Sequence, residues 1–242
     1  MSQRFRYHTS SSSTTSPTAT DTPDSSDNHV TVSTARQTTH VARQSWRRLR
    51  WTSADIAVGA ALGVACGLVF WGFNFAYAWL SPLVGAVLPG LASVFHPMWY
   101  FSGTLAIVIL RKPGAAIYVN LVGVAAEMLL GNQFSVGFVF VSAVLQGVFA
   151  EFPFLVTRYR VFNLPITMAS GALVALEYGV YLMLFRYQGV SFVSPRGAIH
   201  MISELVGGVL IAGVMSWYLY CAIAATGALD RFASGRAARG LE

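Results

Sequence analysis

The chain has 242 residues, of which 55% are hydrophobic and only 11% are charged. Soluble globular domains usually carry about a quarter charged residues, so this composition excludes an ordinary soluble fold and indicates an integral membrane protein. The net charge of +6 comes from short basic clusters between apolar runs, which is typical of topology signals rather than of a nucleic-acid surface. The only lysine, Lys112, does not follow a glycine, so the chain has no Walker loop for hydrolysing ATP.

The N-terminal region differs from the rest of the chain. Residues 1–45 are rich in serine and threonine and have almost no aliphatic residue before Val30, so they cannot bury enough surface to offset their ordering entropy. We predict a disordered cytoplasmic tail there. Residues 46–53 bring arginines and tryptophans to the start of the first apolar run, and we predict a basic juxtamembrane segment suited to an anionic inner leaflet.

Six apolar segments follow, and most reach the roughly 20 residues that a helix needs to cross about 30 Å of hydrocarbon. We therefore predict an all-α integral membrane protein, with a six-helix transmembrane domain over residues 54–230 and a basic cytoplasmic tail over residues 231–242. Three prolines interrupt residues 80–98, where we expect a long loop with a short apolar or re-entrant piece. The predicted spans cover residues 54–79, 91–110, 115–131, 136–157, 165–185 and 197–226.

The arginines are distributed unevenly between the predicted loops. If the N-terminus is cytoplasmic, the inner side collects most basic residues, including Arg111, Lys112 and both terminal clusters, whereas the outer side receives only Arg186 and Arg196. By the positive-inside rule, we predict that both termini are cytoplasmic. The loops expected to face outward are residues 80–98, 131–135 and 186–196.

Three glutamates, Glu127, Glu177 and Glu204, lie at similar depth in the outer halves of their predicted spans. No lysine or arginine lies within those spans to pair with them, and an unpaired carboxylate inside a membrane costs several kcal/mol. Either they bind a ligand, or they are protonated or hydrogen-bonded to nearby groups, as by His200 one turn before Glu204. A fourth, Glu151, lies nearer the inner end, where we expect it to reach a cytoplasmic arginine.

Aromatic and amide side chains gather at the same outer level. Trp71 and Asn74 lie near the end of the first span, and Trp99 and Tyr100 begin the second. An interfacial aromatic belt would account for the tryptophans and the tyrosine, but an amide at the depth of Asn74 needs a partner. Aromatic faces together with unpaired carboxylates are what an organic cation requires, so these residues join the three glutamates as predicted substrate-binding groups.

The sequence contains no pattern typical of an enzyme. Neither a Ser/His pair, nor paired aspartates, nor a metal-ligand arrangement is present, and Cys66 and Cys221 lie within apolar runs as buried small hydrophobes. We therefore predict no catalytic residues, no metal and no cofactor.

The first span carries two stripes of small residues at intervals of four. Ala57, Ala61 and Ala65 form one stripe, and Gly59, Gly63 and Gly67 form the other. Small residues at this spacing let another helix approach closely within lipid. The partner helix can belong to this chain or to another subunit, and the sequence does not separate the two.

Several motifs follow one another along the chain: Arg111-Lys112-Pro113-Gly114-Ala115-Ala116, Glu127 with Gly131-Asn132-Gln133, Gln146-Gly147 with Glu151, Arg158-Tyr159-Arg160, and Thr226-Gly227-Ala228-Leu229-Asp230-Arg231-Phe232. In this order and spacing they resemble the YkoE family, whose members are S components of energy-coupling factor transporters linked to thiamine and its hydroxymethylpyrimidine precursor. The similarity runs from about Thr52 to Arg239, with one departure at Ser102-Gly103-Thr104, where a Gly-Gly-Pro-like stretch is expected.

The resemblance implies a six-helix S-component bundle in the cell membrane, which binds thiamine or its hydroxymethylpyrimidine moiety from outside. It also implies a transmembrane coupling subunit and two cytosolic ATPases as partners. In S components an alanine stripe of the first helix meets the coupling subunit, and Ala57, Ala61 and Ala65 match it. A proton- or cation-coupled secondary transporter remains the alternative, because intramembrane carboxylates also serve as proton relays.

Overall fold

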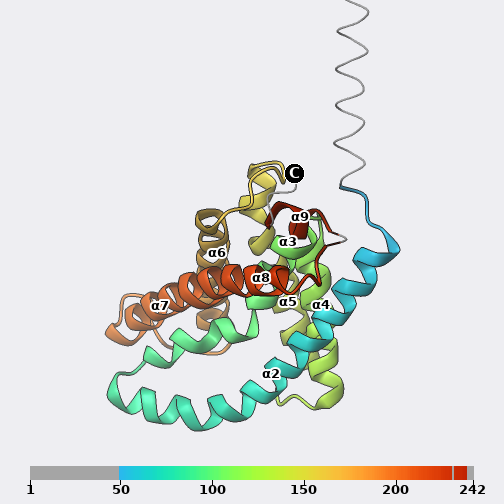
Figure 1. Ribbon diagram of the computed structural model, residues 1–242. Coiled ribbons are helices and arrows are strands. Elements are labelled where there is room, and N and C mark those ends of the chain that lie inside the picture. Colours follow the sequence, from blue (N-terminus) through green and yellow to red (C-terminus); the bar gives the residue numbers. More distant parts are fainter. Residues whose placement is uncertain (1–48, 231, 239–242) are drawn as a thin grey trace, which may run out of the picture. The chain divides into compact units, whose positions relative to one another are not determined.

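The computed structural model describes residues 49–230 and 232–238. Every regular element in these residues is a helix, in agreement with the predicted all-α class (Figure 1). The predicted tail at 1–45 lies outside the described residues, the juxtamembrane segment 46–53 is described only from Leu49, and the C-terminal tail only over 232–238. In chain order the helices are α2 (Ser53–Val87), η1 (Leu91–Trp99), α3 (Phe101–Leu110), α4 (Ala115–Leu130), α5 (Val136–Val156), α6 (Leu164–Phe185), α7 (Pro195–Gly207), η2 (Gly208–Met215), α8 (Ser216–Ala225) and α9 (Ala233–Ala238).

Four helical stretches are long and apolar enough to cross a membrane: α2, α5, α6 and the continuous run Pro195–Ala225. The helices η1 and α3, bent by 41° at Tyr100, form a fifth if they are taken as one span. The remaining helix, α4, is apolar but has only 16 residues. The chain is thus a multi-pass membrane protein, and each predicted span coincides with a helical stretch, but six complete spans and cytoplasmic termini are not confirmed.

The expectation of a long loop over residues 80–98 is wrong for its first half. Helix α2 continues through Pro82 to Val87, and the 3-10 helix η1 begins at Leu91. A proline removes one helical hydrogen bond, yet ending the helix in an apolar medium would leave many more backbone groups without partners. The short apolar piece expected in this region is η1.

Helix α3 forms the centre of the described bundle. All ten of its residues are buried, and it packs against helices α2, α4, α5, α6 and α8. A polar contact with α4 lies at the departure from the family pattern, where Ser102 Oγ donates to Asn120 Oδ1 at 2.6 Å. Asn120 in turn donates to the carbonyl of Ala143 at 3.3 Å, so both polar side chains are satisfied within the apolar core.

The two small-residue stripes of α2 have different neighbours. The glycine stripe is buried against α4: a Cβ added to Gly63 would lie 2.7 Å from Val122, and one added to Gly67 only 2.4 Å from the carbonyl of Gly123. Intramolecular packing therefore accounts for the glycines. The alanine stripe, Ala57, Ala61 and Ala65, is exposed on the surface of this chain.

Glu151 accepts hydrogen bonds at the start of α4. The expectation that it reaches a cytoplasmic arginine is therefore wrong. Its carboxylate accepts hydrogen bonds from the backbone N–H groups of Gly114 and Ala116, both at 2.9 Å, and from the Tyr159 hydroxyl at 3.1 Å. The first N–H groups of a helix have no partner within the helix and carry partial positive charge. A buried carboxylate from α5 supplies the missing acceptor.

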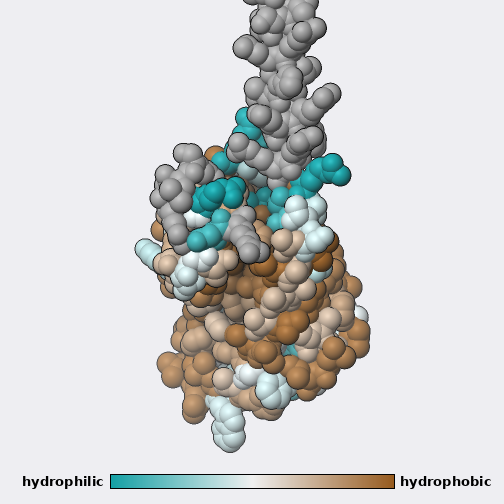
Figure 2. All heavy atoms as spheres, turned by 45° about the vertical axis from the view of Figure 1, so that its right-hand side comes forward, coloured by the Kyte–Doolittle hydropathy of each residue, from teal (hydrophilic) through white to brown (hydrophobic). Residues whose placement is uncertain are grey.

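The described surface is largely apolar on the face that Figure 2 shows, with the hydrophilic residues gathered toward one end. Large apolar side chains are exposed on α2, α5 and α6, as expected of helices that face lipid. Examples are Leu68, Phe75, Phe152, Leu155, Leu184 and Phe185.

Candidate functional site

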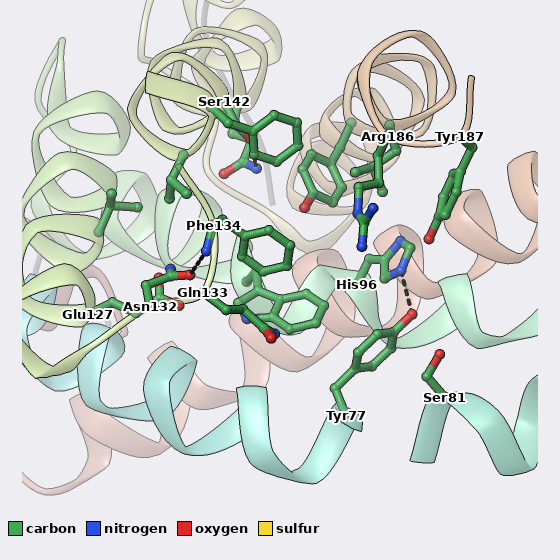
Figure 3. A pocket seen from close by; sticks show the side chains of 17 residues that line it. Tyr77, Ser81, His96, Glu127, Asn132, Gln133, Phe134, Ser142, Arg186 and Tyr187 are labelled. Carbon is green, nitrogen blue, oxygen red and sulfur yellow. Dashed lines mark hydrogen bonds between the residues drawn. The ribbon is translucent and has the colours of Figure 1, made fainter. Parts of the chain in front are cut away.

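A cavity of about 330 Å³ lies between helices α2, η1, α4, α5 and α6. Its size falls at the lower end of the range found for small-molecule sites, and its lining mixes aromatic rings with a few polar groups, as such sites usually do. The turn between α4 and α5 and the segment after α6 complete the wall (Figure 3). The polar and aromatic lining residues are Tyr77, Ser81, His96, Trp99, Glu127, Asn132, Gln133, Phe134, Phe138, Ser142, Gln146, Tyr178, Arg186 and Tyr187.

Three of the predicted site residues form one connected group at this cavity. The Asn74 amide donates to Glu127 Oε1 at 2.7 Å and accepts from the Trp99 indole N–H at 2.9 Å. Glu127 is only 3% exposed, yet among the described residues no hydrogen bond reaches its second oxygen, Oε2. Asn74 thus orients both Glu127 and Trp99, which line the cavity, and leaves one carboxylate oxygen available to a ligand.

Aromatic rings fix the orientation of Trp99. The rings of Phe73 and Tyr77 meet it edge to face, with centroids 4.9 and 4.8 Å away. Such contacts stabilise by roughly 0.5–1.5 kcal/mol beyond the burial of area, and they hold the indole face in one position. Tyr178 lines the same cavity, so a flat ligand ring has aromatic neighbours from both η1 and α6.

A second polar group is built around Glu204, which is fully buried and does not line the cavity. Its Oε2 lies 2.6 Å from His96 Nδ1, and its Oε1 accepts from the Tyr100 hydroxyl at 3.0 Å. The histidine that bonds Glu204 is therefore His96 from η1, not His200 one turn earlier on α7. His200 instead contacts Ser93 and the carbonyl of Gly179.

His96, His200 and Glu204 are also the described side chains whose arrangement could hold a metal ion, with ligand atoms all within 4.8 Å of one another. Each ring nitrogen of the two histidines already has a protein partner. His96 Nδ1 contacts Glu204, and His96 Nε2 contacts the Tyr77 hydroxyl at 2.7 Å. The His200 nitrogens contact Ser93 and the carbonyl of Gly179. The tautomer with a proton on His96 Nδ1 satisfies both of its contacts. Hydrogen bonding accounts for the cluster, which positions His96 at the cavity wall.

The remaining predicted residues lie elsewhere. Trp71 meets Phe75 edge to face on α2, with centroids 5.1 Å apart, and does not line the cavity. Tyr100 does not line the cavity either, because it is fully buried and donates to Glu204. Both carboxylate oxygens of Glu177 are buried without a hydrogen-bond partner among the described residues, and nothing in the structure satisfies them.

Sequence reasoning missed Arg186 and the turn residues as parts of the site. Asn132 and Gln133 belong to a motif of the family resemblance, but their place between two helices gave no signal that they line a cavity. Arg186 follows α6 directly, in a segment that the sequence predicts to be an outward loop. Its guanidinium is directed into the cavity, on the side away from Glu127 (Figure 3). The cavity therefore contains a positive group as well as a carboxylate.

Comparison with known proteins places the chain among transporter components. YkoE of Bacillus subtilis (strain 168), described as a candidate HMP/thiamine permease, is 27% identical over 187 residues, which are 77% of this chain and 91% of that protein. This relative confirms the resemblance to YkoE that the motifs indicate.

A crystal structure of an S component of an energy-coupling factor transporter shares the fold. Its TM-score is 0.70 at 24% identity, and the alignment covers 79% of this chain and 94% of that one. A family model described as ABC-type cobalt transport system, permease component, matches residues 54–177. That match covers about half of the present chain, so the chain belongs to this family of ABC-type transport permease components.

Proposed function

We propose that this chain is the substrate-binding membrane subunit of an energy-coupling factor vitamin transporter, and that it binds thiamine or its hydroxymethylpyrimidine moiety from outside. The observation that carries the proposal is the cavity in which Asn74 holds Glu127 and Trp99 together. The similarity to YkoE and to the S-component fold supports it. No covalent step is involved, so the chain acts as a binding protein and not as an enzyme.

The chemistry of the cavity suits an aminopyrimidine. A ring nitrogen and an exocyclic amine offer an acceptor and a donor side by side, and a protonated or ionised Glu127 can bond either of them. Trp99 and Tyr178 offer aromatic faces to a flat ring, and thiamine adds a permanently charged thiazolium, which favours aromatic faces and carboxylates. The amides of Asn132, Gln133 and Gln146 supply further partners.

Isothermal titration of thiamine and of hydroxymethylpyrimidine into the detergent-solubilised chain tests this proposal. We expect saturable binding of at least one of them without any other subunit and without an ion gradient. Uptake by the chain alone in ATP-free vesicles, driven by a proton or cation gradient, would instead show a secondary transporter and overturn the proposal.

The exposed alanine stripe is the proposed contact with a transmembrane coupling subunit, which two separate ATPases would drive. Ala57, Ala61 and Ala65 cover no helix of the described bundle, so a second helix can approach α2 closely there. The absence of a Walker loop in this chain agrees with ATP hydrolysis in another subunit.

Replacing Ala61 with tryptophan separates docking from binding. We expect Ala61→Trp to keep vitamin affinity unchanged and to abolish uptake in cells that contain the whole transporter, because a large side chain would hold the partner helix away. Gly63→Ala is the matched control on the opposite stripe: its added methyl would meet Val122 at 2.7 Å and should destabilise the chain by about 1–3 kcal/mol. Normal uptake by Ala61→Trp would remove the stripe from the docking surface.

A further inference from the structure

Two arginines flank Tyr187 beside the cavity. Arg186 lines the cavity that contains Glu127, and Figure 3 shows its guanidinium directed inward, on the side away from Glu127. Arg196, in the first turn of α7, lines a neighbouring cavity of about 370 Å³. Both cavities include Tyr77, Ser81 and Tyr187, so these three residues form the partition between them.

Both guanidinium groups are close enough to act on the same hydroxyl. The Arg196 guanidinium carbon lies 5.9 Å from the centroid of the Tyr187 ring. Burial raises the pKa of Tyr187 most, and the negative charge of Glu204 raises it further, whereas the positive charges of Arg186 and Arg196 act to lower it. Two positive charges therefore act at this end of the cavity, where they would attract an anionic group on entry.

No carboxylate among the described residues pairs directly with either guanidinium group. Neither Arg186 nor Arg196 forms an ion pair in the described part of the chain. The segment from Arg186 to Arg196 contains no acidic residue, and neither does the turn at 131–135. Glu204 is held by His96 and Tyr100, and the Arg186 guanidinium lies on the side of the cavity away from Glu127 (Figure 3). The five N–H donors of Arg186 are thus available to a ligand that enters the cavity.

We propose that Arg186 forms an anion subsite of this cavity, which takes a phosphate monoester carried by the same ring-containing ligand that meets Glu127. The inference rests on the proposed function for the ring and adds a phosphorylated form to the substrate class. A guanidinium binds phosphate oxygens through two parallel hydrogen bonds, and the hydroxyls of Ser81 and Tyr187 line the same wall as further donors. A carboxylate at one side and a guanidinium at the other match a ligand with a basic ring and an anionic tail.

The test compares thiamine with thiamine monophosphate by calorimetric titration in detergent without added phospholipid. We expect the wild-type chain to bind the ester at least tenfold more tightly than thiamine, which is the lower end of the range for hydrogen bonds to a charged group. Arg186→Gln should remove this gain, so that the variant binds the ester no more tightly than it binds thiamine. Arg160→Gln, the same change of charge at an exposed position after α5, should keep the gain. An ester that binds no more tightly than thiamine, or a gain that survives Arg186→Gln, would overturn the subsite.

Two further arms separate the possible causes. Inorganic pyrophosphate, titrated alone, should bind to the wild type and not to Arg186→Gln. If pyrophosphate binds in this way and thiamine does not bind, the subsite stands and the proposed vitamin function fails. If thiamine binds and pyrophosphate does not, the vitamin function stands and the subsite fails. Loss of the ester gain on adding an equimolar anionic phospholipid would assign the guanidinium to lipid headgroups and overturn the proposal.

Discussion

Glu127 and Glu204 are the same residue type at similar predicted depth, yet the structure surrounds them differently. Glu204 is hydrogen-bonded to His96 and Tyr100, so both of its oxygens have partners, and it does not line the cavity. Among the described residues, Glu127 accepts a hydrogen bond only from Asn74, on one oxygen, and it lines the cavity beside Trp99. A buried carboxylate is therefore structural or available for binding according to how many partners the fold brings to it, and not according to its depth in the membrane.

The largest expected effect separates the two residues by stability. Glu204→Leu leaves the His96 ring and the Tyr100 hydroxyl without their acceptor and should lower the free energy of unfolding by about 3–5 kcal/mol. Thermal unfolding of the detergent-solubilised protein measures this loss. The fraction that remains folded should keep its vitamin affinity. A variant that unfolds like the wild type but no longer binds would place Glu204 in the site instead.

The next effect is on binding. Glu127→Gln is nearly isosteric and should leave stability unchanged, but it should weaken vitamin binding by about 1.5–3 kcal/mol, the range for a hydrogen bond to a charged group. Calorimetric titration of thiamine and of hydroxymethylpyrimidine distinguishes two arrangements. An equal loss for both ligands places Glu127 against the shared pyrimidine, and a loss for thiamine alone places it near the thiazolium. Unchanged affinity for both would remove Glu127 from the site.

The smallest effect concerns the group that holds Glu127 in place. Trp99→Phe keeps an aromatic ring beside Phe73 and Tyr77 but removes the N–H that Asn74 accepts, so affinity should fall by about 0.5–1.5 kcal/mol. Trp71→Phe is the matched control on α2, since Trp71 lies outside the cavity, and it should change nothing. Equal losses for the two variants, measured by the same titration, would favour a general aromatic belt over a specific site.

The apolar runs were sufficient to predict where the long apolar helices lie, because a membrane leaves the backbone few alternatives. They misplaced the end of α2, since Pro82 interrupts a helix in water more readily than within an apolar segment. The π-helical turns of η2 left no recognisable pattern, because they lie in a run that is apolar throughout.

The sequence indicated Asn74, Glu127 and Trp99 as candidate binding residues, but it did not indicate which of them are hydrogen-bonded to one another. Asn74 and Glu127 are 53 residues apart, and His96 and Glu204 are 108 apart, so only the packing of α2, η1, α4 and α7 decides which amide or ring meets which carboxylate. The position of Arg186 at the cavity was unpredictable for a related reason. A basic residue after a span is ordinarily a topology signal, and only the fold turns this side chain toward the cavity.

A structure of the chain with thiamine bound would test the central claim most directly, through the distance from the ligand to each carboxylate. The account predicts that the ligand occupies the cavity of α2, η1, α4, α5 and α6, that a pyrimidine nitrogen lies within hydrogen-bond distance of Glu127, and that Glu204 keeps its bonds to His96 and Tyr100. A ligand that instead contacts Glu177 or Glu204 and leaves Glu127 without a ligand atom would contradict it.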